Sequence, residues 1–163
     1  MTFRLQSIPF PLFPMPSDSR WIPGSPSPGS KDWQSHDKAQ RPRILVLDDE
    51  IVIAETVVEI LRHAGFDAIV VTNGAAAVEK AGEWLPQVVL SDVVMPGMNG
   101  IETGIQIRER VPDCKVILFS GQAATLDMLE KARLQGYDFQ ILAKPIKPEQ
   151  LIAAIRFALI SEP

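Results

Sequence analysis

The sequence predicts an α/β fold built on a five-stranded parallel sheet with helices on both faces. Short runs of branched apolar residues alternate with amphipathic segments five times after Arg43, and turn residues separate the two kinds of segment. Such runs are typical of strands buried on both faces, and a helix is the usual connection between parallel strands. A sheet of this kind places its ligand site at the carboxyl ends of its strands.

The five expected strands are apolar runs rich in Val, Ile and Leu. Gly, Pro, Asn, Asp or Ser residues stand close to their ends, as is usual where a strand gives way to a turn. We expect the strands at residues 43–47, 66–72, 87–91, 115–120 and 139–143. None is long enough to be confused with a helix of several turns, so the runs define the order of the sheet elements.

A segment with helical periodicity follows each expected strand. The first carries an apolar stripe that we expect to face the core: Ile53, Val57, Ile60, Leu61 and Ala64. Gly65 and Gly136 stand where left-handed helix caps are expected. The other helices are expected over residues 74–84, 101–111 and 124–135, and from Pro148 onward with a stripe of Leu151, Ile152, Ile155 and Leu159.

The amino-terminal quarter of the chain has a different composition. Residues 1–42 hold eight of the 14 prolines and five Lys or Arg against three Asp, whereas residues 43–163 hold eleven basic against seventeen acidic residues. We expect residues 1–42 to be a disordered Pro/Ser-rich arm, either with aromatic residues that dock on a partner or with no role. Residues 43–163 are expected to form one domain.

Charge and cysteine content exclude several classes of function. An acidic domain without a basic stripe gives no reason to expect a nucleic-acid partner. Prolines interrupt any signal-peptide helix, and no run reaches the ~18 apolar residues of a membrane span. The single cysteine, Cys114, lies in an apolar stretch and is expected to be a buried thiol in a reducing compartment. We therefore expect a cytoplasmic protein without a membrane partner.

Polar residues that fit a single chemistry follow four of the five strands. Asp48 and Asp49 follow the first strand, Asp92 the third, Ser120 the fourth and Lys144 the fifth. Acids gathered at one edge repel each other unless a cation lies among them, and oxygen ligands favour Mg²⁺. A carboxylate beside this ion, with a hydroxyl and an ammonium group nearby, can accept a phosphoryl group. Taken singly, the acids also fit a helix N-terminus or a turn.

Four motifs, in this order, resemble the receiver (response-regulator) domain of bacterial two-component signalling: "ILVLDDE", "LSDVVMPGMNG", "VILFSG" and "AKPI". The spacing also fits, with 44 residues from Asp48 to Asp92, 28 more to Ser120 and 24 more to Lys144. The resemblance covers the chain from Arg43 to about Leu159. It implies a flavodoxin-like, doubly wound (βα)5 fold that takes a phosphoryl group from a sensor histidine kinase or a histidine phosphotransfer protein.

The resemblance also implies a role for each site residue. Asp92 is then the phosphoacceptor, and Mg²⁺ is bound by Asp49 directly, by Asp48 through water, by Asp92 and by the backbone carbonyl of Val94. Ser120 is the switch hydroxyl that turns toward the phosphoryl group. Lys144 supplies the ammonium group, and its bond to Pro145 is expected to be cis.

The sequence departs from the family pattern in two places. The position three residues before the lysine, usually aromatic, is Ile141, and one extra residue lies between Gly136 and Lys144. Phe139 and Ile141 share strand parity, so either side chain is a candidate for the switch residue. Val94 and Gln122 stand where a polar residue could orient the hydrolytic water, and the apolar Val94 predicts a long-lived phosphoryl group.

The chain ends soon after the last expected helix, which favours a stand-alone receiver that acts on a downstream protein by phosphorelay or docking. It would be no enzyme beyond self-phosphotransfer and autodephosphorylation, and phosphorylation-dependent homodimerisation stays open. One alternative is a docking module that is not phosphorylated. Another is a Mg²⁺-dependent aspartyl phosphatase or phosphotransferase, but such enzymes carry a cap over the substrate, for which residues 43–163 leave no room. A nucleotide-binding module would need a Gly-rich loop after the first strand.

Overall fold

The computed structural model describes residues 41–121 and 126–161, and it has five strands and five helices in alternation. In chain order they are β1 (Arg43–Leu47), α2 (Ile51–His63), β2 (Asp67–Val71), α3 (Gly74–Trp84), β3 (Val88–Asp92), α4 (Gly100–Arg110), β4 (Lys115–Ser120), α5 (Leu126–Leu134), β5 (Gln140–Ala143) and α6 (Pro148–Ile160). The predicted order of elements is confirmed. Of the expected arm, only residues 41 and 42 are among the described residues. Gln122 and residues 124 and 125, where the fourth helix is expected to begin, also lie outside them.

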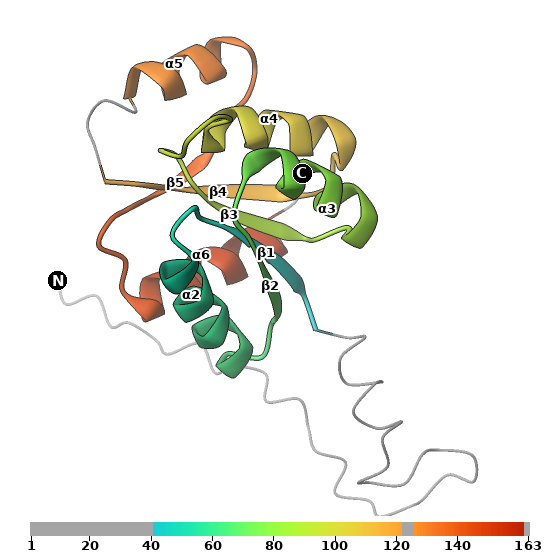
Figure 1. Ribbon diagram of the computed structural model, residues 1–163, viewed down its shortest axis with the longest axis vertical. Helices are drawn as coiled ribbons and strands as arrows, with labels where there is room; N and C mark the ends of the chain where they lie inside the picture. The colour runs from blue at the N-terminus through green and yellow to red at the C-terminus, as the bar shows by residue number, and fades with distance from the viewer. Residues whose placement is uncertain (1–40, 122–125, 162–163) are drawn as a thin grey trace, which may run out of the picture. The chain divides into compact units, whose positions relative to one another are not determined.

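The five strands form one parallel sheet in the order β2-β1-β3-β4-β5. The chain runs outward from β1 to β2, returns across β1 to β3 and then continues in the other direction, so the direction of winding reverses between β1 and β3 (Figure 1). The register aligns the carboxyl ends of neighbouring strands, because Leu47 pairs with Ser91 and Ser120 pairs with Ala143. Residues that follow these strands therefore meet at one edge.

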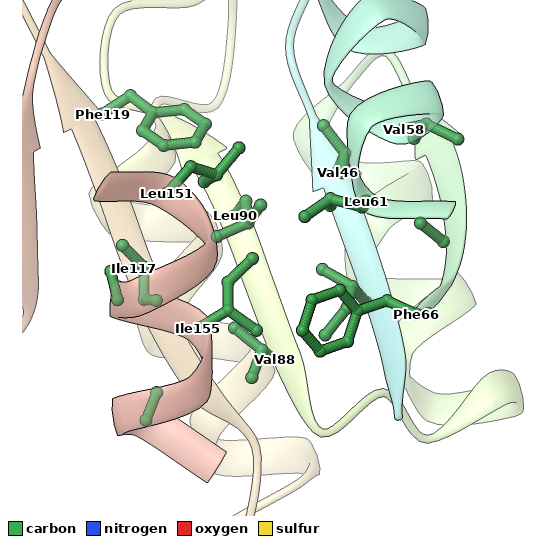
Figure 2. Packing of buried hydrophobic residues seen from close by; sticks show 14 of the residues in the cluster. Val46, Val58, Leu61, Phe66, Val88, Leu90, Ile117, Phe119, Leu151 and Ile155 are labelled. Carbon is green, nitrogen blue, oxygen red and sulfur yellow. The ribbon is translucent and has the colours of Figure 1, made fainter. Parts of the chain in front are cut away.

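Helices cover both faces of the sheet, as the sequence predicts (Figure 1). α2 and α6 pack on one face, where Leu61, Leu90 and Ile155 belong to one apolar cluster (Figure 2). α3, α4 and α5 supply Ala77, Ile107 and Ala132 to a second cluster on the other face. The inner strands are buried on both sides, which explains their continuous runs of apolar residues.

The expected inner face of α2 is wrong at its first position. Ile53 is 40% exposed, and the buried side chains are those of Ala54, Val58 and Leu61. The neighbouring residues Ala54 and Val58 take the core-facing positions, while Val57 and Ala64 of the expected stripe are only partly buried against the same cluster. The other local expectations are confirmed: Gly65 and Gly136 have positive φ, Pro148 begins α6, and Cys114 is buried.

Gly100, the first residue of α4, lies against the end of β3. A Cβ atom at this position would overlap the carbonyl oxygen of Asp92 and would lie 2.8 Å from the Ser91 hydroxyl oxygen. Gly82, inside α3, differs because its Cβ would meet the side chain of Arg110, which is flexible and ends in solvent. Both glycines lie in helices, but an added methyl group would meet backbone at Gly100 and a flexible side chain at Gly82. Their alanine variants therefore give a matched comparison.

We predict that Gly100→Ala lowers the free energy of unfolding by roughly 1–3 kcal/mol, since backbone atoms must shift to accommodate the methyl group. Gly82→Ala is expected to be neutral or to stabilise by up to about 1 kcal/mol, because alanine favours the helix and Arg110 can move aside. Urea denaturation of the two variants measures both effects. An equal or larger loss in Gly82→Ala would contradict this account of Gly100.

Candidate functional site

Three carboxylates meet at the carboxyl ends of β1 and β3. Asp48 and Asp49 follow β1, and Asp92 is the last residue of β3; one carboxylate oxygen of each lies within 4.8 Å of the others. Asp48 is only 3% exposed, whereas Asp49 is open to solvent. Oδ1 of Asp48 accepts a 2.9 Å hydrogen bond from the backbone N–H of Glu50, which fixes the carboxylate beside the first turn of α2.

Lys144, which follows β5, supplies the positive charge of this acidic site. Its Nζ lies 3.1 Å from Oδ2 of Asp92 and 4.0 Å from Oδ2 of Asp48. The backbone N–H of Lys144 donates to the carbonyl oxygen of Ser120 at 2.9 Å, and the Lys144–Pro145 peptide bond is cis, as expected. Hydrogen bonding to the end of β4 thus helps to place the ammonium group above the two carboxylates.

Burial of the Asp48 carboxyl group is the main electrostatic feature of the site. Burial raises the pKa of the Asp48 carboxyl above its ordinary value of 3.8, and the nearby carboxylates of Asp92 and Asp49 add to this rise. The Glu50 N–H and the Lys144 ammonium group act in the opposite direction without cancelling it. Three oxygen donors with one partly exposed lysine therefore fit a hard divalent cation, which would relieve the repulsion.

The connection from β3 to α4 fixes the position of Asp92. The backbone N–H of Val93 donates to Phe119, and the N–H of Gly100 returns to the carbonyl oxygen of Val93. Asn99 caps α4 by accepting hydrogen bonds from the N–H groups of residues 101 and 102, while Glu102 accepts from the N–H of Asn99. The backbone hydrogen bonds of Val93 hold the start of this short loop and the capping box holds its end, so the carboxylate stands at a fixed point of the edge.

The remaining predicted residues occupy different surroundings. Ser120 ends β4, half-buried, at the same edge as Asp92 and Lys144. The N–H of Val94 donates to Oδ1 of Asp92 at 3.4 Å, and its side chain is 53% exposed beside the site. Phe139 directly precedes β5, which begins at Gln140 and not at residue 139 as expected; Phe139 is buried in the core, whereas Ile141, within β5, is exposed.

Sequence reasoning missed the groups that hold these side chains in place. The N–H of Glu50 and the hydroxyl of Ser91, which donates to the carbonyl oxygen of Asp92 at 2.9 Å, carry no sequence signal of their own. The capping box did carry one, because "NGIE" has Asn and Glu at the required spacing before an apolar stretch. Among the described residues, no helix has both the length and the apolar character needed to span a bilayer.

Comparisons with known proteins agree with this geometry. Residues 44–156 match the family described as the response regulator receiver domain. The chemotaxis protein CheY of Thermotoga maritima is 32% identical over 114 residues, which cover 69% of this chain and 93% of that protein. The DNA-binding response regulator MtrA of Mycobacterium tuberculosis is 35% identical over 121 residues, 73% of this chain and 51% of MtrA. The chain thus spans about half the length of its MtrA relatives.

Solved structures show the same fold. A response regulator receiver domain protein from Clostridium thermocellum has a TM-score of 0.66 at 28% identity, covering 72% of this chain and 94% of that one. The chemotaxis protein CheY4 of Vibrio cholerae has a TM-score of 0.66 at 26% identity, covering 73% and 99%. The match covers nearly all of each of these two chains and about three quarters of this one.

We predict that Asp48→Asn raises the thermal unfolding midpoint in the presence of a chelator by roughly 2–4 °C, which corresponds to about 1 kcal/mol. The asparagine amide oxygen can still accept the hydrogen bond from the Glu50 N–H, and the substitution removes a buried negative charge. Lys144 still has its ion pair with Asp92. Because the carboxyl pKa is raised in the folded state, this advantage is present at neutral pH, declines as pH falls through the raised pKa and is absent below about 3.8.

Scanning calorimetry at several pH values measures this effect, with Asp113→Asn as the control because Asp113 is exposed near the opposite ends of the strands. A divalent cation should then stabilise the unmodified protein more than Asp48→Asn. A lower midpoint for Asp48→Asn in chelator would show instead that the Asp48–Lys144 pair stabilises the fold.

Proposed function

The chain belongs to the response regulator receiver domain family, and from this premise we propose that Asp92 is its phosphoacceptor, served by Lys144, Ser120 and a Mg²⁺ ion. The observation that carries the proposal is the 3.1 Å contact between Lys144 and Asp92 beside two further acids. The pair is only partly buried, since the Lys144 side chain is 34% exposed and that of Asp92 13%, so an incoming phosphoryl group can reach it.

The ion is proposed to bind Asp49 and Asp92 directly, Asp48 through water, and the backbone carbonyl of Val94. The donor set supports this assignment, because all of these ligands are oxygen atoms and the buried Asp48 carboxylate gains most from a neighbouring cation. When bound, Mg²⁺ neutralises charge on the transferring phosphoryl oxygens. The exposed position of Asp49 leaves room for water ligands, which Mg²⁺ usually retains.

In the proposed reaction an oxygen of the Asp92 carboxylate forms a bond to phosphorus while the bond from phosphorus to a histidine nitrogen of the donor protein breaks. The electron pair of the broken bond stays on the imidazole. Lys144 offsets the charge of the phosphoryl oxygens and the Ser120 hydroxyl donates a hydrogen bond to one of them. Autodephosphorylation is the attack of water on the same phosphorus atom, which restores the carboxylate.

Family membership implies a histidine kinase, or a histidine phosphotransfer protein, as donor and a further protein as the recipient of the signal. Because receiver domains take their phosphoryl group from such donors, we also propose a cytoplasmic location. MtrA is named a DNA-binding response regulator, and the matched part is about half of it. Our expectation that nucleic acid is not a partner therefore concerns residues 43–163 alone. Relay, docking and homodimerisation all remain compatible with this phosphoacceptor role.

We expect incubation with acetyl phosphate and Mg²⁺ to add the mass of one phosphoryl group to the protein, and Asp92→Ala to abolish the adduct. Asp113→Ala is the control for unspecific modification of an exposed acid. Intact-protein mass spectrometry is the measurement. An adduct that persists in Asp92→Ala would overturn the assignment of the phosphoacceptor, absence of any adduct would favour a docking module, and steady phosphate release from an added substrate would favour a phosphatase.

The exposed, apolar Val94 side chain cannot orient a hydrolytic water molecule. We predict that Val94→Asn shortens the lifetime of the phosphoryl group on Asp92 by roughly fivefold, the factor that corresponds to one added hydrogen bond of about 1 kcal/mol. Loss of label from phosphorylated protein measures the lifetime, and Val94→Ala controls for the change in size. An unchanged lifetime in Val94→Asn would contradict the proposed effect of this position.

A further inference from the structure

A pocket of about 460 Å³ lies at the amino ends of β4 and β5, at the end of the sheet opposite to the acidic site. We call it the β4 pocket. Its origin is a difference between the two strands: β4 begins at Lys115, but the first residue of β5, Gln140, pairs with Ile117. The side of β4 that faces β5 is therefore open at its first two residues. Arg108 of α4 and Phe157 of α6 line the pocket as well, and its volume is in the range of small-molecule sites.

The backbone N–H of Val116 points toward the β4 pocket. Successive residues of a strand direct their N–H groups to opposite sides, and the N–H of Lys115 donates to Gln87, on the β3 side, at 2.9 Å. The Val116 N–H therefore points to the β5 side, where Asp138 would be next in register. No hydrogen bond joins it to Asp138 or to any other loop residue that the structure describes. Val116 is only 6% exposed, and a buried N–H without an acceptor is rare in folded proteins.

Two half-buried cationic side chains, those of Arg108 and Lys115, line the same pocket, and Asp138 is the one acid among its described lining residues. The Arg108 guanidinium group is held in place, because its carbon lies 5.9 Å and 5.8 Å from the ring centres of Tyr137 and Phe139, and its Nη1 donates to the carbonyl oxygen of Asp138 at 3.1 Å. Its other N–H groups are thus positioned in advance. A carboxylate fits these donors, because its two oxygens can accept from a guanidinium group and from a backbone N–H together.

The α6 side of the pocket is apolar. The Phe157 side chain is 62% exposed, and Ile117 and Ala158 line the pocket beside it. Ile117 belongs to the apolar cluster between β4 and α6 (Figure 2). An exposed aromatic ring next to such a surface favours a flat apolar group that can stack on it. The β4 pocket therefore combines donors for an anion on one side with a stacking surface on the other.

We propose that the β4 pocket binds a small aromatic carboxylate. The carboxylate accepts hydrogen bonds from the Val116 N–H and from the Arg108 and Lys115 side chains, and the aromatic ring stacks on Phe157. The ligand thereby supplies the acceptor that a longer β5 would have given to the Val116 N–H. This binding is independent of the phosphoacceptor role of Asp92, because the two places lie at opposite ends of the strands.

The test uses naphthoate as the probe, with its neutral amide and acetate as comparison ligands. Each is titrated into the full-length, ¹⁵N-labelled protein, and the amide signals are followed by NMR. We expect naphthoate to shift the Val116 signal in a saturable manner, with a dissociation constant at or below about 1 mM. The amide, which lacks the charge, and acetate, which lacks the ring, should each bind at least about fivefold more weakly. Equal binding of naphthoate and acetate would show an adventitious anion site and would overturn the proposal.

Variants of the lining residues provide the second measurement. Lys115→Gln should weaken naphthoate binding by roughly fivefold, since a charge-assisted hydrogen bond is lost, whereas Lys131→Gln, at an exposed lysine of α5, is the matched control and should leave it unchanged. Asp138→Asn should tighten binding by about twofold, because it removes an exposed negative charge from the rim. The same spectra show whether each variant is folded.

An unmoved Val116 signal, or equal affinity in Lys115→Gln and Lys131→Gln, would overturn the proposed site. Asp92→Ala should bind naphthoate as the unmodified protein does. A loss of binding in Asp92→Ala would contradict the independence of the two places and would overturn the proposal, while leaving the assignment of the phosphoacceptor to the acetyl phosphate experiment.

Discussion

Repulsion among three carboxylates at one edge of the sheet is the constraint on which the rest of this structure depends. Asp48 is buried and its ionised form is disfavoured, and this is opposed by the Glu50 N–H and by the Lys144 ammonium group, which approaches Asp92 and Asp48 from the end of β5. The contact requires β5 to be in register with β4, and β4 with β3. The alignment of three strands is thus coupled to a single ion pair, and a cation would complete the balance of charge.

Rigid connections on the Asp92 side complement this arrangement. The Asn99–Glu102 capping box and the contact of Gly100 with the Asp92 carbonyl oxygen leave the β3–α4 loop little freedom. Catalytic groups act best when their surroundings fix them before the reaction begins. In this chain, therefore, the Asp92 carboxylate is held rigidly, while Ile141 on β5 is exposed.

Much of this could be predicted from the sequence, because the responsible signals are local. Apolar runs define the strands, and the motifs after them place Asp48, Asp92, Ser120 and Lys144 at one edge once the sheet is parallel. The inner face of α2 was misjudged at Ile53 because periodicity alone does not fix how the helix is rotated about its axis against the sheet. Phe139 and Ile141 could not be distinguished by parity, since Phe139 is buried by packing against α4, a part of the chain distant in sequence, whereas Ile141 stays exposed.

The position of the site at the carboxyl ends of the strands has a consequence for how the chain can be engineered. Because the acids and the lysine follow the carboxyl ends of the strands, the opposite turns, near Gly65, Pro86 and Asp113, carry no part of the site. Those turns lie a whole strand length away from the chemistry. They are the natural points for inserting a reporter or another domain, or for opening the chain in a circular permutation, without disturbing the acidic edge of the sheet.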